Sequence, residues 1–491
     1  MSEKINDSAL KKAKKQRIQL YSGIIGFVIL LMLPSPQGLS TNGKNVLVLL
    51  LFQMYLLVTR VMPFGVVGLL PVVIIPILGI LGTKIDKELL VSAVLGYSND
   101  IIFLVMSGFM IGGVMQKWGL HKRVSYGIAA KIGNKPSTIL LAFMIASAFI
   151  SMFLTNTATV VMMMPVALAF IKATDLKEGN LFAAALVTSI SYSANMGGVG
   201  TPTGSSLSAG AIGIIPQLTG HDFNYTMYLA IGVPYAIISI FMAWLILKWI
   251  YKPDKATGIE NVQKDVILEA RKNLGKITKT ETYISIILLI MFMGILTRPL
   301  IWGKYLPKVS DGVFVTFVSL IMFLVPVDKE EYLYTWSDAK RDIDVGMLLM
   351  IGGFLTLGSL LGPTGVTSYL ADLISKIEGI NGIAGVYLIG GITNFLSNFG
   401  VNMFAALPLS HAVATGMNLN IPLTLFVVTC VAQLNISLPE RATNALSIGT
   451  GYATPGQLLK GGILISISNV LIAPIIIYFI TMGIFGVGTG W

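Results

Sequence analysis

Charged residues are scarce in this chain of 491 residues, since Asp, Glu, Lys and Arg together make up 12% of it and hydrophobic residues 54%. A soluble domain normally carries about 25% charged residues, so the composition excludes an ordinary globular protein. Apolar runs such as 63–81 and 459–484 reach the length of about 17–25 residues that crosses a bilayer. The sequence therefore predicts an all-α polytopic membrane protein with about 11 transmembrane helices.

Cysteine is almost absent, and three common nucleotide-binding or catalytic motifs are missing. The single cysteine, Cys430, excludes a disulfide within the chain. The sequence has no GxxxxGK[ST] loop for ATP, no HExxH zinc pair and no GxSxG nucleophile elbow. The three histidines, His121, His221 and His411, are far apart in the sequence. We therefore expect neither an ATP-driven pump nor an enzyme, and no cofactor.

Negative charge is also in short supply, because the formal net charge is +11. With the N-terminus inside, most Lys and Arg fall into cytoplasmic segments, as the positive-inside rule requires. Topology thus explains the basicity, and we expect no nucleic-acid partner. The basic tail lacks the composition of a transit peptide. We expect an integral protein of a bacterial plasma membrane, surrounded by lipids, with the N-terminus cytoplasmic and the C-terminus extracellular.

The chain divides into two halves that resemble each other. We expect a cytoplasmic tail 1–17, a first inverted repeat 18–250, a cytoplasmic connector 251–280 and a second inverted repeat 281–491. Each half combines ordinary spans, a re-entrant hairpin and a broken span; these are hairpins 137–173 and 381–416 and broken spans 180–216 and 421–457. An odd number of spans per half gives the halves opposite orientations, a plan common in secondary transporters.

Both hairpins have a polar tip in apolar surroundings: Thr155-Asn156-Thr157 in the first and Ser397-Asn398 in the second, with Asn402 close by. Non-helical backbone at membrane depth is tolerated only where it lines a cavity or is buried in protein. The helix that starts at such a tip directs free N–H groups toward an anion. The alternative is that these side chains join spans by hydrogen bonds worth about 0.6 kcal/mol each. The first tip alone does not decide between the two.

The broken spans carry the other polar residues. Glycines, a proline and hydroxyl residues from Asn195 to Ser206, including Thr201, must interrupt a helix. The second broken span holds Arg441 and Thr443 beside Glu440. An unpaired charge at the membrane centre costs about 2.5–3.5 kcal/mol, and the arginine fork suits a carboxylate ligand. A salt bridge that only closes the fold is the alternative.

The segments SMFLTNTATVVMMMP and ANMGGVGTPTGSS resemble the divalent anion/sodium symporter family, whose members carry dicarboxylates such as succinate and malate, or citrate. The resemblance covers essentially the whole chain. It implies scaffold and transport domains, a homodimer, and an elevator-like displacement of the transport domain, which contains the hairpins and broken spans.

By the same resemblance, Ser151, Thr155, Asn156 and Gly200 would form a sodium site, and Asn156 and Thr157 would touch a substrate carboxylate. Together with the polar residues above, the expected substrate-binding residues are Asn156, Thr157, Thr201, Ser397, Asn398, Asn402, Arg441 and Thr443.

The second half departs from the sodium-coupled pattern. Phe399 stands where a threonine should follow Ser397-Asn398, and the segment 440–443 replaces a small residue, a threonine and paired prolines. The spacing resembles the exchanger branch of the family. We therefore expect a sodium-independent exchanger of C4/C5 dicarboxylates of the succinate, malate and 2-oxoglutarate type, in which Arg441 supplies a fixed charge in place of a cation. The alternatives are a sodium-coupled dicarboxylate or citrate symporter and, from another class, an anion channel.

Overall fold

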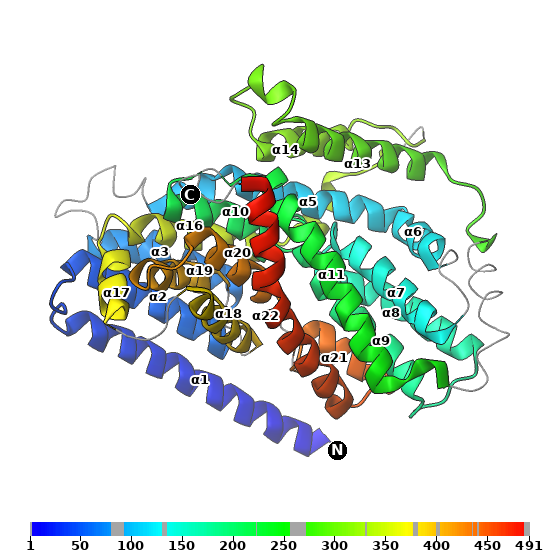
Figure 1. Ribbon diagram of the computed structural model, residues 1–491, viewed down its shortest axis with the longest axis horizontal. Helices are drawn as coiled ribbons and strands as arrows, with labels where there is room; N and C mark the ends of the chain where they lie inside the picture. The colour runs from blue at the N-terminus through cyan, green and yellow to red at the C-terminus, as the bar shows by residue number, and fades with distance from the viewer. Residues whose placement is uncertain are drawn as a thin grey trace.

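The computed structural model describes residues 2–79, 93–129, 135–221, 223–255, 272–328, 331–376, 382–398, 403–434, 436–438 and 441–485. Within these ranges the regular elements are helices, apart from one isolated bridge between Pro326 and Tyr332 (Figure 1). The predicted all-helical architecture is confirmed.

Six of the described helices are long and apolar enough to cross a membrane, or seven if the bent pair α15 (Trp336–Asp342) and α16 (Val345–Leu361) is one span. The six are α2 (Thr41–Thr59), α5 (Asp100–Lys117), α8 (Asn156–Ala173), α11 (Tyr225–Tyr251), α13 (Lys279–Thr297) and α22 (Pro455–Phe485). Five further apolar helices are shorter. Length and composition thus single out fewer helices than the eleven spans predicted from the sequence, because some spans are short or broken.

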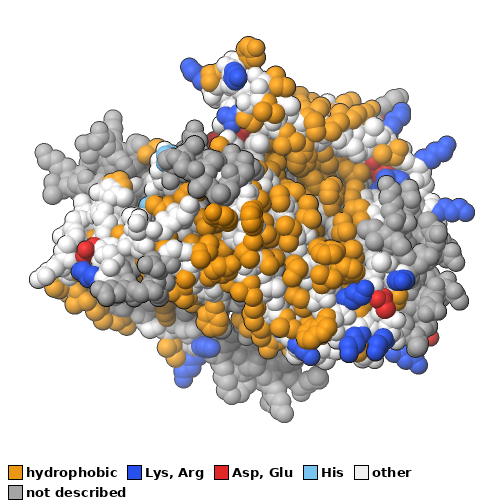
Figure 2. Space-filling model, viewed as in Figure 1, with side chains coloured by type: hydrophobic (Ala, Val, Ile, Leu, Met, Phe, Trp, Pro, Cys, Tyr) orange, Lys and Arg blue, Asp and Glu red, His pale blue; other side chains and the backbone are white. Residues whose placement is uncertain are grey.

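A broad apolar surface extends across the middle of the molecule, while most Lys and Arg side chains in that view lie toward its edges (Figure 2). Exposed apolar residues over so large an area cannot face water in a stable monomer. They match a belt that faces lipid, so the protein is an integral membrane protein.

The first half of the chain contains two pairs of consecutive helices that are separated by short breaks. Besides the helices already named, the first half has α1 (Ser2–Met32), α3 (Phe64–Leu78), α6 (Leu120–Ala129), α7 (Pro136–Ser151), α9 (Leu181–Val199) and α10 (Ser206–Thr219). Helices α7 and α8 form the hairpin and leave the tip 152–155 between them, while α9 and α10 are separated by residues 200–205. Helix α1 is continuous, so the basic tail and the first apolar run form one element.

The second half of the chain also contains two such pairs. Its remaining helices are α14 (Asp311–Ile321), α17 (Val366–Ser375), α18 (Gly382–Asn398), α19 (Met403–Gly416), α20 (Ile421–Val431) and α21 (Ala442–Gly449). Helices α18 and α19 are the two arms of the second hairpin. Its tip, 399–402, which includes the predicted site residue Asn402, lies outside the described residues, as does Glu440. Helix α22 starts at Pro455, slightly before the predicted end of the broken span.

Two glycines let α3 and α16 approach closely. A Cβ atom at Gly68 would lie 2.5 Å from the backbone of Leu349 and Met350, and one at Gly353 would meet the backbone of Gly68. Small residues permit such backbone contact between membrane helices. The contact places the first residues of α3 and α16 together at one side of the candidate site described below.

An arginine fixes α6 to the end of the connector. The Arg123 Nε atom lies 2.9 Å from the Glu281 Oε1 atom, and its Nη atoms donate to the carbonyls of Leu274, Gly275 and Lys276 at 3.0–3.1 Å. Glu281 is 5% exposed and also caps α13 through Thr278. The guanidinium therefore joins one surface helix to the first turn of the second half.

We expect Arg123→Ala to destabilise the protein by about 1–3 kcal/mol, because it leaves the buried Glu281 carboxylate without its cation. The measurement is the thermal unfolding midpoint of the purified protein in detergent. The matched control is Lys376→Ala, since the Lys376 and Asp372 side chains are 67% and 68% exposed in their pair and such surface pairs contribute about 0–1 kcal/mol. Equal midpoint shifts for the two variants would contradict the proposed role of Arg123.

Candidate functional site

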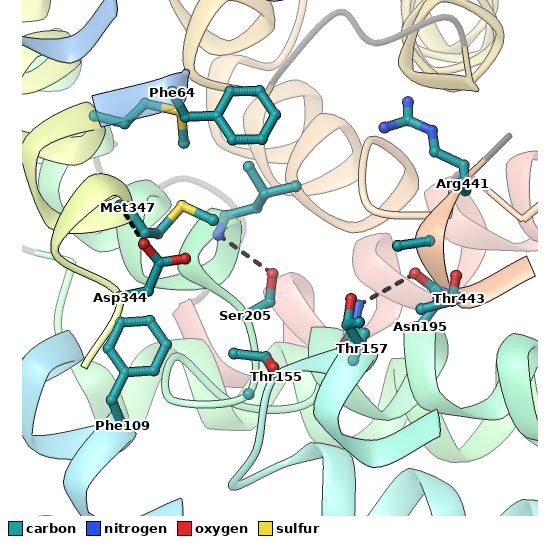
Figure 3. Close-up of a pocket in the computed structure, with 15 residues that line it drawn as sticks. Phe64, Phe109, Thr155, Thr157, Asn195, Ser205, Asp344, Met347, Arg441 and Thr443 are labelled. Atoms are coloured by element: carbon teal, nitrogen blue, oxygen red, sulfur yellow. Dashed lines mark hydrogen bonds between the residues drawn. The ribbon is translucent and has the colours of Figure 1, made fainter. Parts of the chain in front are cut away.

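A cavity of about 270 Å³ lies where the first hairpin and both broken spans meet helices α3, α5 and α16 (Figure 3). Polar residues of the hairpin and broken spans line one side, and mainly apolar residues of α3, α5 and α16 line the other. The first group is Thr155, Asn156, Thr157, Asn195, Gly204, Ser205, Leu207, Arg441, Ala442 and Thr443; the second is Phe64, Phe109, Asp344, Met347 and Met350.

Among the helices of the first hairpin and the broken spans, three begin at this cavity: α8, α10 and α21. The Thr155 Oγ1 atom accepts from the Ala158 N–H at 3.3 Å and the Ser205 Oγ atom from the Leu207 N–H at 3.2 Å, so each caps its helix. Helix α21 follows Arg441, whose side chain makes no such cap. Each helix start carries unsatisfied N–H groups and about half a positive charge. The cavity is therefore suited to an anion.

Arg441 adds a full positive charge. Its Nη2 atom donates to the carbonyl oxygen of Ser397 and, at 3.2 Å, to that of Asn398, the last residues of α18. Its Nε atom is buried and has no hydrogen-bond partner among the residues that the structure describes. The guanidinium is thus held by neutral carbonyl oxygens, and it retains donors for a ligand.

A chain of side-chain hydrogen bonds connects the first tip to the second broken span. Ser151 donates to Asn156 Oδ1 at 2.9 Å, Asn156 donates to Asn195 Oδ1 at 3.2 Å, and Asn195 donates to Thr443 Oγ1 at 3.3 Å. Ser191 on α9 also donates to the carbonyl of Thr443 at 2.5 Å. These bonds connect residues of the two halves of the chain and fix the start of α21 beside the start of α8.

The structure brings four of the predicted substrate residues to the cavity: Asn156, Thr157, Arg441 and Thr443. Thr201 is buried elsewhere. Its hydroxyl donates to the carbonyl of Met152 and accepts from the Gly204 N–H at 3.0 Å, so it connects the first hairpin tip to the break between α9 and α10.

The side chains of the last two residues of α18, Ser397 and Asn398, do not line the cavity. Ser397 and Asn398 both donate to the carbonyl of Asn394, at 2.8 and 2.9 Å, and Asn398 Oδ1 accepts from the Ser437 N–H at 3.1 Å. Their backbone carbonyls, not their side chains, contact Arg441. The described residues beside the two tips therefore contribute differently: Thr155, Asn156 and Thr157 line the cavity themselves, whereas Ser397 and Asn398 contact Arg441 through their carbonyl oxygens.

The expected sodium residues lie together beside the first tip. The Ser151 Oγ and Asn156 Oδ1 atoms are 2.9 Å apart, and Asn156 Oδ1 faces Gly198, where a Cβ atom would collide with it. Gly200 packs against Met152 in the tip. Oxygen atoms from a broken helix are the usual ligands of a coupled sodium ion, so these residues are compatible with one.

Ten of the fifteen cavity residues were not among the predicted site residues: Phe64, Phe109, Asn195, Gly204, Ser205, Leu207, Asp344, Met347, Met350 and Ala442. Asn195 carries a usable signal, because an asparagine beside three glycines in an apolar segment is costly unless it is hydrogen-bonded. Phe64, Phe109, Asp344, Met347 and Met350 show no such signal; only the packing of α3, α5 and α16 brings them to the cavity.

Comparisons with known proteins agree with this description. The family model described as "Citrate transporter" matches residues 54–432. The sodium-dependent dicarboxylate transporter SdcS of Staphylococcus saprophyticus is 30% identical over 96% of this chain and 92% of the relative. SdcS of Staphylococcus aureus (strain MRSA252) is 29% identical over the same shares.

The fold is also similar to that of Neisseria gonorrhoeae MtrF, a protein described with a class of antimetabolite efflux pumps. The TM-score is 0.57 at 13% identity, over 89% of this chain and 97% of that chain. At this identity the likeness concerns the fold alone. The family match and the relatives confirm the resemblance drawn from the motifs and exclude the enzyme reading. The chain belongs to the citrate transporter family, among the divalent anion/sodium symporters.

Proposed function

We propose that this protein is a secondary transporter of C4/C5 dicarboxylates of the succinate, malate and 2-oxoglutarate type. The observation that carries the proposal is the meeting of three helix starts and Arg441 around one cavity. Three helix ends at about half a positive charge each, together with the guanidinium, match a doubly negative ligand. The names of the relatives, sodium-dependent dicarboxylate transporters, support the same substrate class.

Sodium-coupled uptake is the first form of this proposal. It is supported by the printed names of relatives that match 96% of the chain and by the oxygen atoms of Ser151 and Asn156 at the first tip. The relatives thus favour the alternative of the sequence-based prediction over its main form, sodium-independent exchange.

Exchange remains the second candidate because of Arg441. Its guanidinium lies against the carbonyl oxygens that end α18, where the negative end of the helix dipole would favour a cation. A permanent cation there replaces one that could dissociate. The transporter would then reorient poorly without a bound anion, which favours exchange.

Alternating access by an elevator-like movement in a homodimer belongs to the same proposal. The hairpins and broken spans would move as the transport domain, while α3, α5 and α16 would remain in the scaffold. The cavity is lined by the first residues of α3 and α16, which the proposed topology places at the cytoplasmic side. The structure would then represent a cytoplasm-facing state.

Uptake of labelled succinate into proteoliposomes tests the function. We expect an inward sodium gradient to drive accumulation into empty vesicles, and potassium substituted for sodium to abolish it. If internal succinate is required and sodium is not, exchange is correct and the sodium form is wrong. A current without stoichiometric uptake would indicate a channel, and the absence of any dicarboxylate flux would refute the proposal as a whole.

Replacing Arg441 should remove substrate affinity. Arg441→Gln loses a charged hydrogen bond worth about 1.5–3 kcal/mol, so we expect kcat/KM for succinate to fall about 10- to 100-fold. Arg441→Lys should recover little of it, because an ammonium lacks the planar fork. The surface variant Arg341→Gln is the control. Unchanged kcat/KM in a correctly folded Arg441→Gln protein would refute the role of the guanidinium.

Sodium coupling through the first tip predicts a difference between two serines on α7. Ser151→Ala removes an oxygen beside Asn156 and should raise the sodium concentration for half-maximal uptake several-fold. Ser147→Ala is the matched control, since the buried Ser147 hydroxyl has no hydrogen-bond partner among the described residues. If Ser151→Ala leaves the sodium dependence unchanged, the first tip does not bind the coupled ion.

A further inference from the structure

One carboxylate lies in the anion cavity. Among the described residues that line it, Asp344 is the only acidic one. It is the N-cap of α16, where its Oδ1 atom accepts from the Met347 N–H at 3.0 Å, and its side chain has no ion-pair partner in the described part of the chain. The negative charge of Asp344 repels dicarboxylates in a cavity that we propose to bind dianions.

Asp344 and Arg441 lie on opposite sides of the open space in Figure 3, with Ser205 and Thr157 between them. Both side chains line the same cavity of about 270 Å³, and physiological salt screens charges only over a Debye length of about 8 Å. A ligand inside the cavity therefore experiences both charges: a positive side made by Arg441 and the helix starts, and a negative side made by Asp344.

Capping of α16 does not account for the negative charge of Asp344. Asn or Ser would cap α16 as well as Asp does, and the cap uses one oxygen, Oδ1. The charge itself acts on whatever enters the cavity. A second carboxylate directed toward α16 would be repelled, whereas an ammonium group in the same place would be attracted.

We propose that Asp344 determines specificity by favouring amino-dicarboxylates over unsubstituted dicarboxylates. The carboxylates would lie at Arg441 and the starts of α8 and α21, with the ammonium group toward α16. The inference rests on the proposed dicarboxylate transport and names the substrate class of that same cavity.

The test is the Asp344→Asn variant, which keeps the cap and removes the charge. Unlabelled succinate and unlabelled L-aspartate compete with labelled succinate for uptake into proteoliposomes. We expect the affinity for succinate to rise and that for aspartate to fall, each by up to about fivefold, the range of one solvent-screened charge contact. A structural effect of the substitution would shift both affinities in the same direction.

Asp372→Asn is the matched control, because Asp372 forms a 68% exposed surface pair with Lys376 on α17. Should Asp344→Asn fold poorly, Asp344→Ser removes the same charge and retains a capping oxygen. The proposal is overturned if aspartate does not compete in the wild-type protein, or if the two affinities do not move in opposite directions. Failure of succinate transport itself would instead refute the proposed function.

Discussion

Helices that end inside a membrane must satisfy their backbone groups within the protein, because the bilayer offers no water. Here the starts of α8, α10 and α21 and the end of α18 come together in the interior. The three starts leave N–H groups and positive dipole ends around one cavity. The end of α18 leaves carbonyl oxygens, which Arg441 satisfies. The positive side of the cavity follows from this meeting of interrupted helices.

The two halves of the chain differ in the groups that they place beside their hairpin tips. In the first, Ser151 and Asn156 place side-chain oxygens at the tip, where a dissociable cation could bind. In the second, the Ser397 and Asn398 side chains bond within their own half, and a covalently attached cation contacts their carbonyls. A dianion would therefore meet one fixed and one exchangeable positive charge. The dissociable cation favours sodium coupling, and the fixed cation favours exchange.

The cavity also divides its charge between parts that would move relative to each other. Arg441 and the helix starts belong to the hairpin and broken spans, whereas Asp344 belongs to α16, which Gly68 and Gly353 hold tightly against α3. A displacement of the former would carry the ligand away from Asp344. The carboxylate would then act on the ligand in one state only, so it would influence release as well as selectivity.

The sequence alone determined the class of protein. It also pointed to four residues that line the cavity, Asn156, Thr157, Arg441 and Thr443, because polar groups at membrane depth are costly. Local pattern could not show where a side chain points: Thr201, Ser397 and Asn398 satisfy neighbouring backbone groups outside the cavity. It also missed Asp344, whose position at a helix start looks like an ordinary cap. Only tertiary packing, which brings α16 against α3 and α21 against α8, decided which of these residues share a cavity.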